Sequence, residues 1–350
     1  MSAVPQSFDY WDFFVREVER AQDAPLYVQI VRGIAKDDEL KEIARHVTQG
    51  QPMANIILAS VHFLLLRGDT HELRRFYPNL NGGHSLGDDA FPAFRDFVMS
   101  HRGALTPLIA QGVTNTNEVA RCSTLHAGIR AVAKEAGDNL HLIEIGPSAG
   151  LNMIWDKYRV RYTRGGEDFF VGPEDAALTL DCEIRGEIMP PLGATPNIAS
   201  RKGLELNPVD LSDPYWRDWL KALVWPDQTA RFARLQKAID IRLRETLDIR
   251  PGNALMLLPD ALAAIPEDQP VCVYHTYVTY QFSSEMREAL DAILVMAGLR
   301  RPVWRMSAEG SPLRPGDAPL ELRRYHDGIR DKRLLALCHP HGRWIEWQDA

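Results

Sequence analysis

The chain has 350 residues, of which 45% are hydrophobic and 25% are charged, and its formal net charge is −7. These values are ordinary for a globular protein and exclude a largely disordered chain, a collagen and a coiled-coil rod. The acidic balance disfavours general binding to nucleic acid or to an anionic membrane surface.

The first 136 residues predict an all-helical domain. Apolar residues recur at spacings of three and four, for example within 8–18 and 56–65. Pro25 suits the first turn of a helix, whereas segment 77–89 (YPNLNGGHSLGDD) is rich in Gly, Asn and Asp and predicts a loop. The polar run at 114–118 offers capping residues for a helix that continues to residue 136.

The remaining residues, 137–350, predict a second domain in which strands and helices alternate. His141–Ile145 is a short apolar strand that ends at Gly146, and Leu151–Tyr158 is expected to be a helix. Segment 160–195 alternates in polarity and predicts at least two inserted antiparallel strands. Further strands are expected at Gly203–Leu206, Val271–Tyr274 and Val303–Met306, helices at Asp213–Leu223, Ala230–Leu247 and Ser284–Ala297, and a hairpin that pairs Leu334–Cys338 with Trp344–Trp347. Ala254–Leu257 is expected to be a strand or the turn just after one. This pattern favours the α/β class, with a Rossmann-like, doubly wound and mostly parallel sheet that has an antiparallel edge.

The most informative motif is segment 144–152, Glu-Ile-Gly-Pro-Ser-Ala-Gly-Leu-Asn. Glycines let the backbone approach a ligand closely, and a helix N-terminus favours negative groups. A tight turn after a strand also needs glycine without any ligand, so a structural role is one alternative. The dinucleotide pattern G-x-G-x-x-G fails, because Ser148 and Leu151 occupy its second and third glycine positions.

The same letters fit G-x-S-x-G, the nucleophile elbow of serine hydrolases, with Ser148 as the nucleophile. The residues that would complete such a site are Asp260, then His275, His339 or His341, and segment 81–84 (NGGH) as an oxyanion motif. A hydrolase elbow follows several strands, however, and only helices are expected before residue 140. Glu144 also has no role in an elbow. A serine hydrolase is therefore kept as an alternative.

Segment 144–152, together with Thr116–Arg121 (TNEVAR) and His339–Trp344 (HPHGRW), resembles an uncharacterised bacterial protein family over most of the chain. The second half also resembles class I S-adenosylmethionine-dependent methyltransferases. In that class an acidic residue on the first strand is followed by a loop of the form E/D-x-G-x-G-x-G. Glu144, Gly146 and Gly150 match this form, and the small Ser148 replaces the middle glycine.

The methyltransferase resemblance implies S-adenosylmethionine as cofactor and a small molecule as methyl acceptor. It implies that Glu144, Gly146, Ser148 and Gly150 hold the methionine end, Glu205 the ribose and Asn253 the adenine, that Asn117 and Arg121 line the pocket, and that His275 and Tyr277 lie at the methyl-transfer point, with His275 as general base. Simple structural roles remain open: Glu205 and Asn253 as turn residues, residues 117–121 as a helix cap, and His275 as a buried histidine. A non-catalytic ligand-binding protein of the same fold is a further alternative.

Other classes of site have little support. The four cysteines are far apart, and the pair His339 and His341 has no evident third ligand, so no metal is expected. The N-terminus lacks a signal-peptide pattern, and the apolar stretch 56–66 is too short to span a bilayer. We therefore expect a cytoplasmic protein with a small-molecule substrate and with neither nucleic acid nor membrane as partner.

Overall fold

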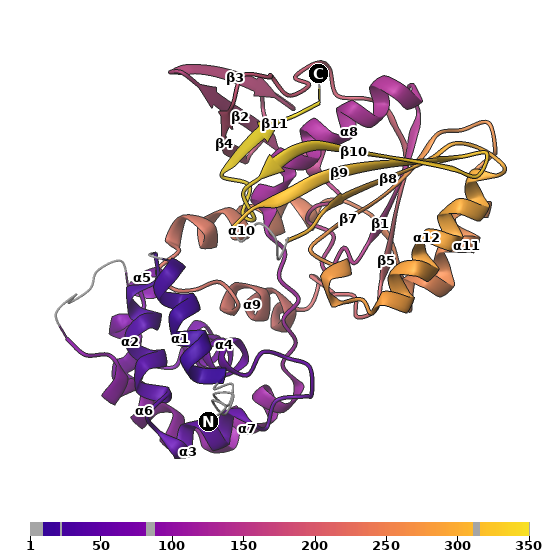
Figure 1. Ribbon diagram of the computed structural model, residues 1–350. Coiled ribbons are helices and arrows are strands. Elements are labelled where there is room, and N and C mark those ends of the chain that lie inside the picture. The colour runs from indigo at the N-terminus through magenta and orange to yellow at the C-terminus, as the bar shows by residue number, and fades with distance from the viewer. Residues whose placement is uncertain (1–9, 22, 82–87, 311–315, 350) are drawn as a thin grey trace, which may run out of the picture. The chain divides into compact units, whose positions relative to one another are not determined.

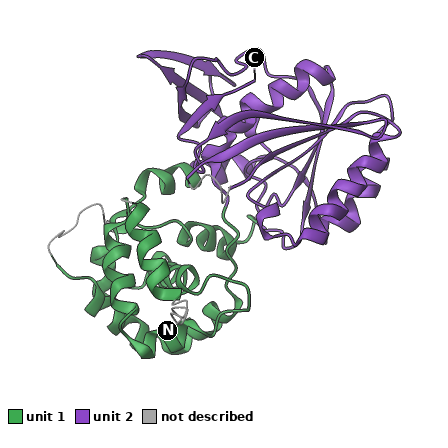
Figure 2. Cartoon of the chain, in the orientation of Figure 1, with its two compact units in different colours: residues 1–116, 211–236 green, residues 117–210, 237–350 purple. Residues whose placement is uncertain are grey.

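The chain divides into two compact units, drawn in green and purple in Figure 2. The computed structural model describes residues 10–21, 23–81, 88–310 and 316–349, so most of the oxyanion motif expected at 81–84 lies outside the described residues. Unit 1 comprises residues 1–116 and 211–236, and unit 2 comprises 117–210 and 237–350. The sequence places a boundary at 136/137, whereas this division gives the helix that ends at Ala136 to unit 2 and residues 211–236 to unit 1.

Unit 1 is helical wherever its secondary structure is regular in the described residues. Its elements are α1 (Tyr10–Ala21), α2 (Pro25–Ile34), α3 (Asp38–Ala44), α4 (Met53–Leu66), η1 (Glu72–Phe76), α5 (Pro78–Asn81), α6 (Phe91–Ser100), α7 (Arg102–Gln111), α9 (Pro214–Ala222) and the first part of α10 (Thr229–Arg242). The helix α4 has buried residues on every side, which explains why its sequence shows no polar face. The helices expected around Pro25, 56–65 and Asp213–Leu223 are confirmed.

Unit 2 is built on a large mixed sheet with helices on its faces (Figure 1). Its strands are β1 (Leu140–Ile145), β2 (Arg159–Arg164), β3 (Glu167–Val171), β4 (Thr179–Arg185), β5 (Ile198–Glu205), β6 (Asp248–Pro251), β7 (Val271–Thr276), β8 (Val303–Ala308), β9 (Ala318–His326), β10 (Ile329–Cys338) and β11 (Trp344–Trp347). They lie in the order β3-β2-β4-β11-β10-β9-β8-β7-β1-β5-β6. The α/β class with a mostly parallel sheet is confirmed.

Parallel and antiparallel pairs occupy different parts of this sheet. From β6 through β5, β1 and β7 to β8, every neighbouring pair is parallel. From β8 through β9 and β10 to β11, every pair is antiparallel, and this part includes the predicted C-terminal hairpin. The inserted strands lie beyond β11, where β2 pairs antiparallel with β3 but parallel with β4. The insertion is therefore only partly antiparallel.

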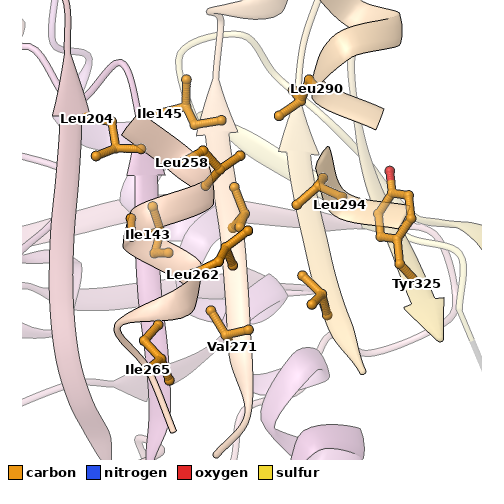
Figure 3. Packing of buried hydrophobic residues seen from close by; sticks show 13 residues of the cluster. Ile143, Ile145, Leu204, Leu258, Leu262, Ile265, Val271, Leu290, Leu294 and Tyr325 are labelled. Carbon is orange, nitrogen blue, oxygen red and sulfur yellow. The ribbon is translucent and has the colours of Figure 1, made fainter. Parts of the chain in front are cut away.

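Alternate residues of the central strand β1 face different helices. Ile143 and Ile145 belong to an apolar cluster with α11 (Ala254–Ala263) and α12 (Ser284–Gly298), which Figure 3 shows in close-up. Glu144 points to the opposite face and pairs in register with Tyr274, which pairs in turn with Met306. The helix α8 (Cys122–Ala136) covers this face, because its Gly128 packs so closely against Met306 that a Cβ there would clash with the Met306 sulfur.

Two expected elements take another form. A strand at Ala254–Leu257 is wrong, because β6 has already ended at Pro251; the segment follows that strand, as the alternative expects, and forms the first turn of α11, which Asn253 caps. Residues 151–158 form turns and the 3-10 helix η3 (Trp155–Lys157), with hydrogen bonds between residues three apart, so no α-helix follows the glycine loop. In addition, the sequence does not predict the strand β9. The expected helix Ala230–Leu247 is too long, because residues 243–247 lie beyond the end of α10. The remaining short elements are η2 (Val119–Arg121) and η4 (Thr279–Gln281).

Candidate functional site

The candidate site lies at the carboxyl end of β1, where three segments far apart in the chain meet. They are the glycine loop at 146–151, segment 117–121 before α8, and the turn 339–342 between β10 and β11. Asn117 donates its side-chain amide to the Pro147 carbonyl at 3.2 Å, and the Arg121 Nε donates to the Pro340 carbonyl at 2.9 Å. The structure thus brings together the three motifs that the sequence singles out.

The glycine loop has an unusual backbone. Gly146, Ser148 and Gly150 have φ angles of 70°, 52° and 76°, the left-handed region that a residue with a Cβ rarely adopts. Packing imposes the same restriction, because a Cβ at Gly146 would lie 2.6 Å from the Val278 side chain. The loop therefore requires both glycines for its own conformation, and Ser148 is held in a strained one.

The backbone amides of this loop are satisfied within the unit. Those of residues 146 and 150 donate to the carbonyls of Leu204 and Pro147 at 2.9 and 2.8 Å. The Ser148 amide donates to the Glu205 carboxylate at 2.7 Å, and the amides of residues 149 and 151 donate to the Asn117 side-chain oxygen at 3.2 and 3.4 Å. Because Pro147 has no amide hydrogen and the other loop amides are taken, the loop lacks the row of free N–H donors that a phosphate needs.

Glu205 lies where the sequence places it, at the end of the strand beside β1. The expected second parallel strand is confirmed, because β5 pairs with β1 with Glu144 opposite Gly203. The Glu205 carboxylate points toward the glycine loop and also accepts from the Asn207 amide at 3.0 Å. Its two oxygens together retain free lone pairs after these two bonds. Glu205 therefore anchors the loop and still offers acceptor capacity at the edge of the sheet.

Glu144 is a buried carboxyl group beneath the loop. It is 2% exposed and accepts a hydrogen bond from the Tyr274 hydroxyl at 2.8 Å. Burial raises its pKa to about 8, although the bond from Tyr274 partly opposes that shift, and the negative charge of Glu205 adds to it. The carboxyl group is therefore mostly protonated at neutral pH unless a cation comes close.

His275 lies on the other face of the sheet from Glu144 and is fully buried. Its Nδ1 lies 2.6 Å from Glu309 Oε1, and the Arg305 Nε donates to its Nε2 at 3.1 Å. Burial lowers the pKa of His275, and Glu309 only partly opposes this effect. Glu309 also accepts from the Val278 amide at 3.0 Å. Both ring nitrogens are thus engaged, and this arrangement fixes the turn that follows β7.

That turn carries Tyr277, which has a φ of 55°. The Arg121 guanidinium lies 4.0 Å from the centre of the Tyr277 ring, a cation–π contact between segment 117–121 and the end of β7. Burial raises the pKa of the Tyr277 hydroxyl to about 12. Tyr277 therefore stays protonated at neutral pH and can act only as a neutral hydrogen-bonding group.

An acid–histidine pair in this site has no counterpart in the sequence-based expectations. Glu118 is 2% exposed, and its Oε2 lies 3.0 Å from the Nδ1 of His341. The other carboxylate oxygen accepts from the Ala120 amide. A buried carboxylate that holds one nitrogen of a histidine fixes the ring and its tautomer, which leaves the second nitrogen as a hydrogen-bond acceptor.

Asn253 lies farther from the loop, beyond β6, which is two strands away from β1. It caps α11 by accepting from the Leu255 amide at 2.9 Å. The four cysteines are buried and free. In the described part of the chain, no group of three His, Cys, Asp or Glu side chains is placed to hold a metal ion. None of the helices described there has the length and apolar composition to span a bilayer.

A search of curated proteins finds no relative of this chain. A family model described as "uncharacterized protein conserved in bacteria (DUF2332)" matches residues 14–347. The match covers almost the whole chain and includes all three segments of the candidate site. The chain therefore belongs to the DUF2332 family.

Proposed function

We propose that the protein is an S-adenosylmethionine-dependent methyltransferase that acts on a small molecule. The observation that carries the proposal is the glycine loop after β1, with Glu205 at the end of the neighbouring strand. Numbered along the chain, the five parallel strands β6-β5-β1-β7-β8 have the order 3-2-1-4-5. Doubly wound sheets with this order bind ligands beyond the carboxyl ends of the strands, where the order reverses, which here is between β1 and β7.

The chemistry of the loop supports a donor-rich, cationic ligand over a phosphate. The loop amides are occupied, whereas the Glu205 carboxylate can still accept hydrogen bonds beyond those from the amides of residues 148 and 207. S-adenosylmethionine carries an ammonium group, a sulfonium group and two ribose hydroxyls, which suit acceptors and negative charge. An ammonium group near Glu144 would also favour ionisation of that buried carboxyl group, whose pKa burial raises to about 8.

In this proposal each predicted residue has a stated task. Glu205 would accept from the ribose hydroxyls, and the loop at 146–150 with Glu144 would hold the methionine amino group. Arg121 would face the methionine carboxylate, and Asn253 would lie on the adenine side. Asn117 would keep the loop in shape through its bonds to residues 147, 149 and 151.

The cofactor supplies an activated methyl group, so the protein contributes mainly proximity and proton handling. His275 would act through Glu309 to position the turn that carries Tyr277. The Nε2 of His341, directed by Glu118, would accept the proton that the methyl acceptor loses. This gives the site a proton acceptor that does not depend on the fully buried His275.

Isothermal titration calorimetry with S-adenosylmethionine and S-adenosylhomocysteine tests the proposal. Glu205→Ala should weaken binding by about tenfold or more, because hydrogen bonds to a charged group contribute roughly 1.5–3 kcal/mol each. Glu205→Gln should lose less, since its amide oxygen still accepts. Glu187→Ala, a change of an exposed carboxylate in the same unit, is the matched control. No binding of either ligand by the wild-type protein would refute the proposal.

A serine hydrolase is the second candidate, favoured by the φ of 52° at Ser148 and by the Glu118–His341 pair. A nucleophile elbow holds its serine in just such a strained turn, and a hydrolase needs an acid-oriented histidine. Two facts count against it: no α-helix follows the loop, and the amide of Ala149, which would serve the oxyanion hole of an elbow, is bound to the Asn117 side chain. Stoichiometric labelling of Ser148 by a fluorophosphonate probe would favour the hydrolase. Binding without transfer in a methyl-acceptor screen would instead indicate a non-catalytic binding protein.

A further inference from the structure

We propose that a pocket of unit 2, between α12 and the strands β8 and β9, binds a small organic anion through a carboxylate or phosphate group. The pocket has a volume of about 550 Å³ and four arginines in its wall: Arg287, Arg305, Arg323 and Arg330. This volume lies in the range of sites for small molecules. The proposal is independent of methyl transfer, because none of these arginines contacts the glycine loop in the structure.

The arginines gather around one carboxylate. Asp291 on α12 accepts from Arg305 at 3.2 Å, from Arg323 at 3.4 Å and from Arg330 at 2.9 Å. It also accepts from the Tyr325 hydroxyl at 2.6 Å. Arg305 and Arg323 are register partners on adjacent strands, so their guanidinium groups emerge side by side on the α12 face. Asp291 is thus shared by three guanidinium groups, each of which has five N–H donors, and Arg323 also lies 3.6 Å from the Glu321 carboxylate.

The other acids of the wall are already used within the protein. Glu309 binds His275 and the Val278 amide, and Glu321 binds Lys332 at 2.7 Å. The Arg305 side chain is only 8% exposed, so its charge is largely removed from water. A buried cation without a full complement of anions is unfavourable. The wall holds four arginines and four carboxylates, but the buried Nε of Arg323 has no hydrogen-bond partner among the described residues. An entering oxyanion would satisfy this donor.

The chemistry of arginine defines the ligand class. A guanidinium group matches carboxylate and phosphate oxygens in a two-point arrangement, and two neighbouring arginines can hold one such group. Glu288 also lines the pocket and is exposed. Its charge disfavours a highly charged anion, so we expect one or two negative charges on the ligand. A small carboxylic acid and a phosphate ester share this chemistry.

The test uses calorimetric titration of the full chain with inorganic phosphate and, separately, with malonate, at low ionic strength. Each of the variants Arg323→Gln and Arg330→Gln should weaken binding by about tenfold, the usual effect of losing a charge-assisted hydrogen bond. Arg324→Gln is the matched control. Arg324 is the next residue on β9 but lies on the other face, 5.6 Å from the centre of the Trp304 ring, and its loss should leave affinity unchanged.

A variant that should bind the anion more tightly distinguishes the loss of an anion contact from unfolding of the pocket. Glu288→Gln removes a negative charge without removing a recorded contact, so it should strengthen binding of either anion by about twofold to threefold. Tighter binding of phosphate would assign the natural group as a phosphate, and tighter binding of malonate as a carboxylate. If the wild-type protein binds neither anion, or if Arg324→Gln loses as much affinity as Arg323→Gln, the proposal is wrong. The arginines would then serve only to tie α12 to the sheet.

Discussion

The two faces of the parallel sheet in unit 2 differ in the kind of side chain that they bury. The face toward α11 and α12 is mainly apolar around β1 and β7, with Ile143, Val273, Leu258 and Leu294 in one cluster (Figure 3), and its buried polar groups, His275 and Arg305, lie to one side of that cluster on β7 and β8. The face toward α8 buries polar groups. Glu144 bonds to Tyr274 there, and the guanidinium group of Arg130 donates to the His126 carbonyl at 2.8 Å.

The two faces of the sheet are therefore expected to contribute differently to stability and to function. Burial of apolar side chains is favourable and needs no exact partners, so the α12 face can stabilise the fold on its own. Buried polar groups on the α8 face are unfavourable unless hydrogen-bonded, and they bring specificity rather than net stability. Glu144 lies directly before the glycine loop, and Arg201 on the same face forms an ion pair with Asp156. We therefore expect variants on the two faces to behave differently.

The largest expected effect is on the apolar face. Leu294 is fully buried on α12, and Leu294→Ala should lower the free energy of unfolding of unit 2 by about 2–5 kcal/mol, because it removes buried methyl groups and leaves a cavity. Met296 lies two residues further on the same helix and is 64% exposed, so Met296→Ala should change stability by less than about 0.5 kcal/mol. Chemical denaturation of both variants measures the difference. Equal effects would contradict the assignment of this face as the stabilising core.

The next effect concerns Glu144 and depends on pH. The folded state binds the Glu144 proton more tightly than the unfolded chain, because burial raises the pKa from 4.5 to about 8. Ionisation therefore opposes folding, and the destabilisation grows above pH 4.5 and is complete above pH about 8. Glu144→Gln cannot ionise, so it should be more stable than the wild-type protein at pH 9, by roughly 1–3 kcal/mol, and nearly equal at pH 5.

Denaturation midpoints of Glu144→Gln and of the wild-type protein, measured from pH 5 to pH 9, give this comparison. Glu187→Gln removes an exposed carboxylate from the same unit and should show no such trend. A stability difference for Glu144→Gln that stays constant over this range would show that Glu144 is ionised in the folded protein. The α8 face would then hold a buried charge, and its contrast with the α12 face would be sharper than we infer.

Much of the fold can be predicted from the sequence, because a short apolar run between turn-forming residues has few alternatives to a buried strand. The cores of β1, β5, β7 and β8 were all expected, and so was the parallel pairing of β5 with β1. The errors arise where a run is ambiguous. Ala254–Leu257 is as apolar as a buried strand, but Asn253 caps it as a helix. After Gly150 the expected helix is replaced by turns, since the Asn117 side chain takes the amides of residues 149 and 151.

The site is less predictable because its contacts link distant segments. Local pattern identifies the glycine loop and Glu205, since the loop follows one strand of the parallel section and Glu205 is the last residue of another. The Glu118–His341 pair joins residues 223 positions apart, and no periodicity connects them. The occupation of both His275 nitrogens likewise depends on Glu309 and Arg305, which lie on or beyond another strand. Only the shared occurrence of motifs TNEVAR and HPHGRW could have suggested that these segments meet.

A smaller effect is expected at Asn117, which links the α8 side of the molecule to the glycine loop. Asn117→Ala removes one donor and one acceptor that together bind residues 147, 149 and 151. It should destabilise unit 2 by about 1–2 kcal/mol and weaken S-adenosylmethionine binding severalfold through a looser loop. Asn117→Asp keeps the acceptor but places a carboxylate oxygen near the Pro147 carbonyl, so it should bind no better than Asn117→Ala. Calorimetry would reveal wild-type affinity in both variants if the loop does not form the binding site.

The smallest expected effect is at Ser148, where two opposing terms nearly cancel. Its φ of 52° strains any residue with a Cβ, so Ser148→Gly relieves about 1 kcal/mol in the folded state. Glycine also gives the unfolded chain more freedom, which costs about 0.4–1 kcal/mol. Stability should therefore stay within about 1 kcal/mol of wild type, whereas Ser148→Ala, which keeps the strain, should be no more stable than wild type. Because the loop binds the proposed ligand through its backbone, Ser148→Gly should also retain S-adenosylmethionine affinity. Loss of all activity in both variants, together with fluorophosphonate labelling of the wild-type protein, would make Ser148 a nucleophile and the polar face part of a hydrolase.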